Sequence, residues 1–268
     1  MDLGFTDARI CVQGGSAGMG RAAAEAFARE GARIAIISRD AARLDETAER
    51  LRALGSPEVL TASADIGDTR SVNAAFAQIA AIWPHLNALV NAAGPQSSGQ
   101  PWHAIDDAKW LESFSVGALG ALRCARAALP LLRAADWARI VNLSAMSTQH
   151  HSPGLADYTA SKAALVSISK NMALELAADG ILVNIVSPGP VMSANLRAYI
   201  TAGSEGAVDP DDLVASGQWL QSRFGNTTDV GRVAHPDEIA PAILLAASRA
   251  SSFMTGANIN VDGGSHFQ

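Results

Sequence analysis

Cysteine, basic residues and long apolar runs are all scarce in this chain of 268 residues. The two cysteines, Cys11 and Cys124, lie in separate apolar stretches without a CxxC pair or a histidine cluster nearby. This argues against a disulfide framework and predicts reduced core residues. No window holds ~18 uninterrupted apolar residues, and residues 1–9 carry three charges in place of an apolar leader segment. The sequence therefore predicts a cytoplasmic protein with no membrane partner.

Positive charge is limited and dispersed. The chain has 20 lysines and arginines against 26 aspartates and glutamates, a net charge of −6, and no basic run that could follow a phosphate backbone, so no nucleic acid partner is expected. His150 and His151 have no Asp, Cys or His at metal-ligand spacing, so no metal is predicted. Apolar residues are abundant, at 49% against 17% charged, and can bury a large core.

Short β-branched runs alternate with longer Ala-rich segments of helical period along the chain. This alternation is typical of α/β proteins, in which helices cover both faces of a parallel sheet. We therefore predict a single α/β domain over residues 1–268, with strands at residues 9–13, 33–37, 58–63, 88–91, 139–143, 182–187 and 258–261.

Residues 193–228 interrupt this alternation. They mix Gly, Ser, Asp and Asn with short helical fragments. Such a segment indicates a mobile loop or a small helical lid lying over a site. The alternative is a surface insertion without a function.

A glycine-rich turn, residues 14–20, follows the first strand and leads into a helix. Glycines let the backbone approach a pyrophosphate closely, and the helix N-terminus offers free N–H groups, so the turn indicates a dinucleotide site. The second strand ends at Ser38 and Arg39, where an acidic residue would bind a ribose 2′-hydroxyl. Arg39 can pair with a 2′-phosphate instead, which predicts NADP(H) over NAD(H). The alternative is a solvated Arg39 paired with Asp40 or Asp68.

Six motifs resemble, in the same order, those of the short-chain dehydrogenase/reductase family, with a pattern like that of its 3-oxoacyl-ACP reductases. The glycine turn looks like TGxxxGxG, with Gln13 where Thr is usual; residues 91–94 resemble NNAG and residues 158–162 match YxxxK. The adenine, PG and C-terminal motifs are similar to residues 65–66, 187–189 and 261–264. The resemblance covers nearly the whole chain.

The resemblance implies a single-domain Rossmann fold with strand order 3-2-1-4-5-6-7. It also implies hydride transfer at a carbonyl or alcohol carbon, and a homotetramer. The cofactor-binding residues that it implies are Gly14, Ser16, Gly18, Met19, Gly20, Arg39, Asp65, Ile66, Asn91, Ala93, Gly94, Lys162, Pro188, Gly189 and Val191.

Tyr158 and Lys162 are four residues apart in a helical segment, so their side chains leave the same face. Lowering a tyrosine pKa from about 10 to about 7 takes roughly 4 kcal/mol, which a nearby ammonium and an oxidised nicotinamide can supply. We predict that Tyr158 is the acid/base and that Lys162 lowers its pKa. The resemblance implies that Lys162 also binds the nicotinamide ribose.

Two positions depart from the family pattern. Ala145 stands where the family has a serine that polarises the substrate carbonyl, and Gly117 stands where it has an asparagine that kinks a helix and holds a water. Ser144 is one residue early, and in an extended segment it reaches the pocket only through a bulge or a one-residue shift. We predict Ser144 as the catalytic hydroxyl, with Ser147 as the other candidate. A substrate that polarises its own carbonyl is an alternative.

The leading hypothesis is an NADP(H)-dependent oxidoreductase that interconverts a ketone and a secondary alcohol. The competing hypothesis is a cofactor-binding relative with weak or no turnover, a scaffold or sensor. His150 and His151 can act as acids or donors near the site, although exposed loop histidines without a role are commoner. A largely apolar pocket is indicated by residues that follow strand ends, namely Gln96, Trp102, Met146, Met192 and Trp219.

Overall fold

A computed structural model describes residues 2–225 and 228–265 of the chain. Its centre is one sheet of seven parallel strands in the order β3-β2-β1-β4-β5-β6-β7, which confirms the topology implied by the resemblance. Every predicted strand agrees with an observed one to within about one residue at each end. The strands are β1 (Arg9–Gln13), β2 (Arg33–Ser38), β3 (Val59–Ser63), β4 (Ala88–Asn91), β5 (Ala138–Leu143), β6 (Ile181–Pro188) and β7 (Asn258–Val261).

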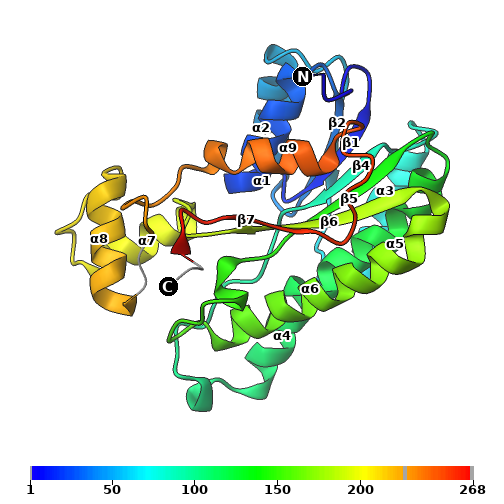
Figure 1. The fold of residues 1–268 in the computed structure, drawn as a ribbon. Helices are drawn as coiled ribbons and strands as arrows, with labels where there is room; N and C mark the ends of the chain where they lie inside the picture. Colours follow the sequence, from blue (N-terminus) through cyan, green and yellow to red (C-terminus); the bar gives the residue numbers. More distant parts are fainter. Residues whose placement is uncertain (1, 226–227, 266–268) are drawn as a thin grey trace.

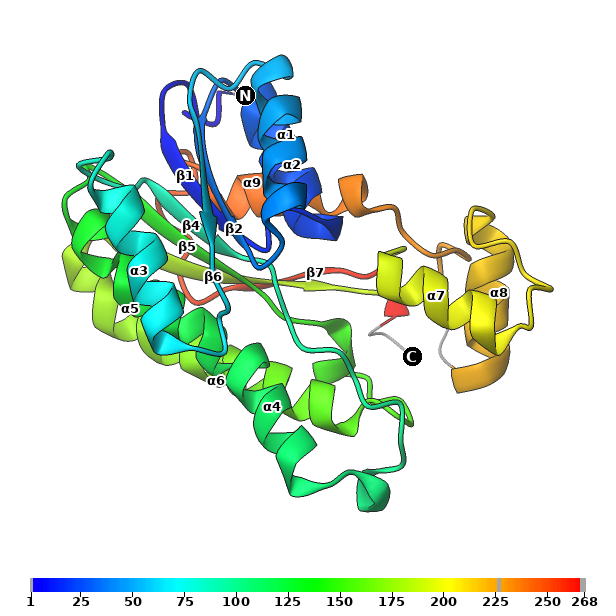
Figure 2. The same cartoon turned by 180° about the vertical axis from the view of Figure 1, so that it is seen from behind.

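Helices cover both faces of the sheet, as the alternation predicted (Figures 1 and 2). Along β2, Ile34 and Ile36 face one apolar core and Ala35 and Ile37 face the other, so the strand is apolar throughout. The first core lies under α1 (Gly18–Arg29), α2 (Ala41–Ala53) and α9 (Ala240–Ala247), and the second under α3 (Thr69–Ala80), α5 (Leu119–Arg133) and α6 (Ala156–Leu176). Other short elements are α4 (Asp107–Gly117), η1 (Trp102–Ala104), η2 (Met146–Thr148), η3 (Ala177–Asp179) and η4 (Pro236–Glu238).

Both cysteines lie in the second core. Cys11 and Cys124 are buried and unpaired, as the sequence predicted. Burial raises the pKa of both thiols, so they stay protonated at neutral pH and are poor nucleophiles.

The segment that interrupts the sequence pattern is helical. It contains α7 (Ala194–Gly203) and α8 (Leu213–Phe224), which project beyond the carboxyl ends of the strands (Figure 1). A small apolar cluster of their own, centred on Met192, Ile200, Leu220 and Val233, holds them together. The segment is therefore a packed helical unit, and the part of it at residues 226–227 lies outside the described residues.

One helical stretch in the described part of the chain, Asp107–Arg133, is long and apolar enough to cross a membrane by length and composition alone. Half of its apolar window is buried inside the fold, where α5 packs on α3 and on β4 and β5. The stretch is also interrupted at Ala118, where α4 ends and α5 begins. A core helix of a compact protein meets the same criterion.

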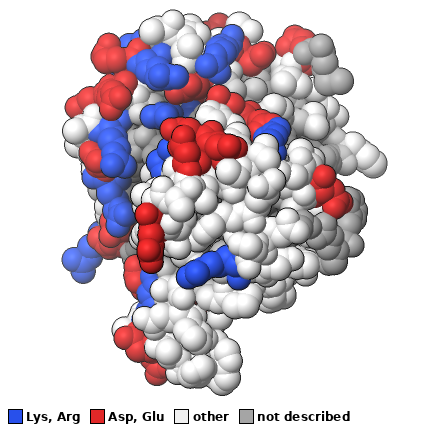
Figure 3. Space-filling view, turned by 90° about the vertical axis from the view of Figure 1, so that its left-hand side faces the viewer, with Lys and Arg blue, Asp and Glu red and all other residues white. Residues whose placement is uncertain are grey.

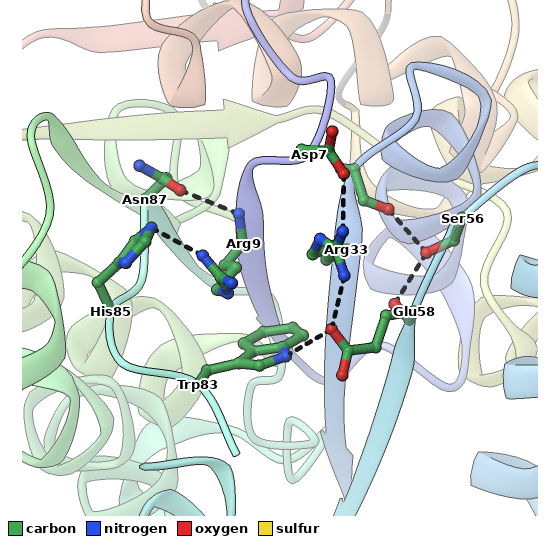
Figure 4. A network of polar contacts seen from close by, with 9 residues as sticks. Asp7, Arg9, Arg33, Ser56, Glu58, Trp83, His85 and Asn87 are labelled. Carbon is green, nitrogen blue, oxygen red and sulfur yellow. Dashed lines mark hydrogen bonds and ion pairs between the residues drawn. The ribbon is translucent and has the colours of Figure 1, made fainter.

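Polar contacts tie together the amino ends of the strands (Figure 4). Arg33 donates to Asp7 at 2.9 Å and to Glu58 at 3.1 Å, and the indole N–H of Trp83 donates to the same Glu58 carboxylate at 3.0 Å. Arg9 and His85 lie in hydrogen-bond contact at 3.0 Å. Burial, and then the charge of Arg9, lower the pKa of His85, so it is a neutral partner of the guanidinium at pH 7.

Arg139, at the start of β5, is a buried cation whose partners are backbone carbonyls. Its guanidinium donates to the carbonyls of Ser248 at 3.1 Å and Arg249 at 3.3 Å, just after α9. We expect Arg139→Met to lower the free energy of unfolding by about 2 to 4 kcal/mol, because buried carbonyls lose their donors. Urea denaturation measures this. Arg133→Ala is the control: it removes an exposed pair with Asp179 and is expected to cost less than about 1 kcal/mol. Equal losses in the two variants would contradict the assignment.

Candidate active site

The turn between β1 and α1 is shaped for close approach of a ligand. Gly14 has a φ of +80°, and a Cβ there would lie 2.7 Å from the amide nitrogen of Ala93. A Cβ on Gly20 would collide with the carbonyl of Gly14, whereas Gly18 faces open space. The helix begins after Ala17 without a side-chain cap, so its first N–H groups remain available to an anion. Because the turn is this tight at Gly14 and Gly20 and leaves N–H groups free, it fits the diphosphate of a dinucleotide.

Gln13 connects two of the predicted cofactor segments. Its buried side-chain oxygen accepts a hydrogen bond of 3.2 Å from the amide of Ala93, in the segment after β4. The departure from the family's usual Thr therefore keeps a polar link between the glycine turn and residues 91–94. In that segment Asn91 is buried and donates to Asn142 at 2.8 Å. A Cβ on Gly94 would lie 2.9 Å from Nζ of Lys162, so this glycine lies directly against the lysine.

Arg39 lies at the end of β2 with its side chain free of the two acidic residues weighed from the sequence. Asp40 caps α2 and pairs with Arg43 at 3.2 Å, and Asp68 caps α3. Within residues 2–225 and 228–265, the guanidinium of Arg39 has no ion-pair partner. The structure therefore leaves this cation available to a ligand at the end of β2.

Residues 65–66, which resemble the family's adenine motif, are contacted by residues of α5. The side chain of Asp65 accepts from the amide of Gly67 at 2.8 Å, and Ile66 packs on Gly120. Arg123 donates to the carbonyl of Ile66 at 2.9 Å and to the carbonyl of Ser115 at 2.7 Å. Arg123 was not predicted from the sequence, since an arginine in an Ala-rich helix gives no local signal of its partners.

The PG motif and the C-terminal motif meet at the same sheet edge. Gly189, just after Pro188 at the end of β6, donates to the carbonyl of Val261 at 3.0 Å. A Cβ on Gly189 would lie 2.7 Å from Cα of Asp262, so only glycine fits. Val191 follows in a buried β-bridge to Ala234. These two segments therefore lie side by side at the carboxyl ends of β6 and β7.

Tyr158 and Lys162 lie together on α6 at this edge. Nζ of Lys162 is 5.9 Å from the centre of the Tyr158 ring and donates to the carbonyl of Leu143 at 2.7 Å. Burial raises the pKa of Tyr158 to about 12 and lowers the pKa of Lys162 to about 8. The phenol is therefore protonated at neutral pH, in contrast to the lowered pKa that the sequence predicted, and the ammonium is still largely charged.

Ser144 and Ser147, the two candidates for the hydroxyl that Ala145 lacks, both have hydrogen-bond partners within the protein. Ser144 is buried, and its Oγ donates to the carbonyl of Lys162 at 3.3 Å. Ser147 is also buried and accepts from Thr159 at 3.2 Å. Ala145 lies in extended backbone, with φ −158° and ψ 149°. Because Ser144 turns toward α6 and neighbours in extended chain point apart, Ala145 presents its methyl group to the opposite side.

Gly117 preserves a helix break but leaves no room for a side chain. The helix is interrupted there, with α4 ending at Gly117 and α5 beginning at Leu119. A Cβ on Gly117 would collide with Oγ of Ser161, one turn after Asp157 on α6. The water-holding side chain implied by the resemblance therefore has no counterpart at this position.

The predicted pocket residues lie in different surroundings. Met146 is buried just after β5 and Met192 is buried in the apolar cluster of α7 and α8, whereas Trp102 is 72% exposed in η1. Trp219 belongs to the α7–α8 unit, where its ring contacts Tyr199 at 5.6 Å between centroids. Among the described residues, no three His, Cys, Asp or Glu side chains gather at a metal site.

The end of the molecule that carries α7 and α8 faces the viewer in Figure 3. Its charged side chains gather along the top and the left of the view, and a few others lie on the rest of this face. Much of the middle of this face carries neither sign of charge.

Known proteins with similar sequences match along nearly the whole chain. A family model described as Enoyl-(Acyl carrier protein) reductase matches residues 14–266. Cis-4-hydroxycyclohexanecarboxylate dehydrogenase of Sinomonas cyclohexanicum is 32% identical over 264 residues, covering 98% of each chain. Galactitol 2-dehydrogenase (L-tagatose-forming) of Cereibacter sphaeroides is 34% identical over 258 residues, covering 94% of this chain and 92% of its own.

A solved structure of high similarity is L-sorbose reductase from Gluconobacter frateurii, complexed with NADPH and L-sorbose. It has a TM-score of 0.92 at 28% identity, and the match covers 100% of both chains. The RhlG/NADP complex of Pseudomonas aeruginosa has a TM-score of 0.86 at 27% identity, covering 99% of this chain and 98% of its own. These matches, together with the six motifs that the fold gathers at one sheet edge, show that the chain belongs to the short-chain dehydrogenase/reductase family of oxidoreductases.

Proposed function

We propose that the protein is an NADP(H)-dependent oxidoreductase that interconverts a ketone and a secondary alcohol, with Tyr158 as acid/base. The observation that carries this proposal is the pairing of Tyr158 with Lys162 at the edge of the sheet where the glycine turn and the PG motif also lie. Open α/β sheets bind their ligands at this carboxyl edge. The proposal keeps residues 1–268 as one domain, with α7 and α8 as a lid over the substrate.

The cofactor, when bound, supplies or accepts the hydride at the carbonyl carbon. The protein's own groups handle the proton. In reduction, the protonated phenol of Tyr158 donates to the substrate oxygen, and the ammonium of Lys162 stabilises the phenolate that remains. In oxidation the same groups act in reverse. The glycine turn would hold the diphosphate, and Lys162, which lies against Gly94, would also bind the nicotinamide ribose.

Polarisation of the substrate carbonyl needs a donor other than residue 145, which is an alanine. The proposal assigns it to Ser144 or Ser147, or to a polar group on the substrate itself. The hydroxyl of Ser144 contacts the carbonyl of Lys162, and the hydroxyl of Ser147 contacts that of Thr159, so either serine must redirect its hydroxyl to take this role.

Support for the substrate class comes from the relatives and from the surface. Relatives named for galactitol, L-sorbose and a hydroxycyclohexane carboxylate act on polyols, a ketose and a ring alcohol. The weakly charged face near α7 and α8 favours a small, mostly uncharged substrate. The test is NADPH oxidation with ketoses, cyclic ketones, dicarbonyls and β-keto thioesters. Turnover of at least one class is expected, and no turnover on any of them would overturn the proposal.

Arg39 is proposed to select the cofactor. Its unpaired guanidinium at the end of β2 can bind a 2′-phosphate, so Arg39→Ala is expected to raise the Kd for NADPH about 10- to 100-fold and to leave that for NADH within about twofold. Fluorescence titration measures both constants. Arg43→Ala is the matched control, because Arg43 already pairs with Asp40. Equal affinities for NADPH and NADH, unchanged in Arg39→Ala, would refute this role.

A second candidate function is a cofactor-binding scaffold or sensor with weak or no turnover. Ala145 and Gly117, which lack the family's usual polar groups, favour it. Tight NADPH binding without turnover on the whole carbonyl panel would establish this alternative.

Assembly as a cytoplasmic homotetramer is also proposed. Leu111 on α4 and Leu174 on α6 are exposed apolar side chains, which supports contact between subunits through these helices. Light scattering after gel filtration gives the subunit number, and a monomer at micromolar concentration would contradict the proposal.

A further inference from the structure

Asp157, the residue before Tyr158, is a fully buried carboxylate. Its exposed fraction is 0%, and within residues 2–225 and 228–265 it has no cationic partner. A buried carboxylate is costly unless donors surround it, so its neighbours show what it holds in place.

The donors come from two segments that lie beside the proposed pocket. Ser113 on α4 donates its hydroxyl to Asp157 at 2.8 Å. The amide and hydroxyl of Ser98, in the loop after β4, both donate at 3.3 Å. Asp157 therefore joins α4, this loop and the first turn of α6.

A second set of contacts joins the loop after β4 to the residues just before α6. Ser97 donates to the carbonyl of Gly154 at 2.8 Å, and a Cβ on Gly154 would lie 3.2 Å from the carbonyl oxygen of Gly99. The loop after β4 thus follows the chain that leads into α6, and both form one wall beside Tyr158.

Helices α4 and α6 contact each other at two successive turns. Ser113 contacts Asp157, and Gly117, one turn later, packs on Ser161, one turn after Asp157. Gly117 offers no side chain, so the polar contact between the helices comes from the earlier turn.

We propose that Asp157 is a positioning residue: by accepting hydrogen bonds from Ser113 and Ser98, it fixes the start of α6 and so aims the Tyr158 hydroxyl at the substrate. This inference rests on the proposed function. A displacement of about 1 Å at a reacting group can cost 10²-fold in rate, so a residue that never touches substrate can still control turnover.

The test compares kcat and cofactor affinity in four variants. Asp157→Ala and Ser113→Ala are expected to lower kcat by about 10- to 100-fold with the Kd for NADPH within about twofold. Asp157→Asn, which keeps one acceptor oxygen, should retain more activity than Asp157→Ala. Ser56→Ala is the matched control. Ser56 is buried and donates to the carbonyl of Ala32 at 2.7 Å, but it lies at the amino ends of the strands, away from the proposed site (Figure 4).

The outcomes separate positioning from general destabilisation. A normal kcat in folded Asp157→Ala would overturn the inference, and so would an equal fall in Ser56→Ala. Adding Ser113→Ala to Asp157→Ala should cost nothing further, because both remove the same contact.

A second readout serves if the wild-type protein turns over no carbonyl, in which case the proposed function fails by itself. The chain has two tyrosines, so Tyr199→Phe leaves Tyr158 as the single phenol. Burial raises the pKa of Tyr158 to about 12, and phenolate absorbance with rising pH follows its ionisation. Asp157→Asn and Asp157→Ala remove the same negative charge, so a loosened first turn in Asp157→Ala should let the phenol ionise at lower pH than in Asp157→Asn, whereas Ser56→Ala should leave its ionisation unchanged. Identical titrations in all variants would overturn the inference.

Discussion

Replacing Tyr158 by phenylalanine is expected to lower kcat for carbonyl reduction by about 10²- to 10⁴-fold, with the Kd for NADPH within about twofold. Phenylalanine keeps the ring beside Lys162 and removes only the proton donor. The donor is ready at neutral pH because burial raises the pKa of Tyr158 to about 12. Steady-state NADPH oxidation gives kcat, and fluorescence titration gives the Kd.

The pH dependence gives this prediction a second check. Burial lowers the pKa of Lys162 to about 8, so its ammonium is charged below that pH and neutral above it. Because the charge stabilises the Tyr158 phenolate, kcat/KM for reduction should fall as pH rises through about 8. Residual activity in Tyr158→Phe should lose this fall. Full activity in Tyr158→Phe at pH 7 would disprove the acid/base role.

Much of the fold is readable from the sequence because the signals are local. In β2, four apolar residues in a row face two cores, and the run is recognisable without any partner. The glycine turn is also recognisable from its own residues, since Gly20 is required by the carbonyl of Gly14 in the same turn, although Gly14 is also required by Ala93 in the segment after β4. Strand ends therefore agree with the prediction.

The parts of the site that the sequence left open depend on distant contacts. Ser144 could be placed near the pocket by spacing, but its bond to the carbonyl of Lys162 joins residues 18 apart across two elements. Asp157 gave no signal because its donors, Ser98 and Ser113, lie 59 and 44 residues away. Residues 193–228 were predicted either as a mobile loop or as a small helical lid. The sequence left this open because the helices are held by apolar contacts between α7 and α8.

Ala145→Ser is expected to raise kcat/KM for carbonyl reduction by about 10²-fold, because a preorganised donor at a developing oxyanion is worth on the order of 10²- to 10³-fold. Ala145 is buried at the end of β5 in extended backbone, and its methyl group points away from the Ser144 contact with α6. The substitution adds one hydroxyl oxygen to the side chain. Steady-state kinetics on the preferred ketone measures the gain.

The control keeps the size of the new side chain and removes most of its donor strength. Ala145→Cys adds a sulfur of similar placement but a weak donor, so it should gain little. An unchanged rate in Ala145→Ser would show that another group already polarises the carbonyl. Ser144→Ala and Ser147→Ala then decide which group it is: a loss of about 10²-fold in one variant assigns the role to that serine, whereas no loss in either assigns it to the substrate. The size of the gain thus measures how much the alanine at this position costs the enzyme.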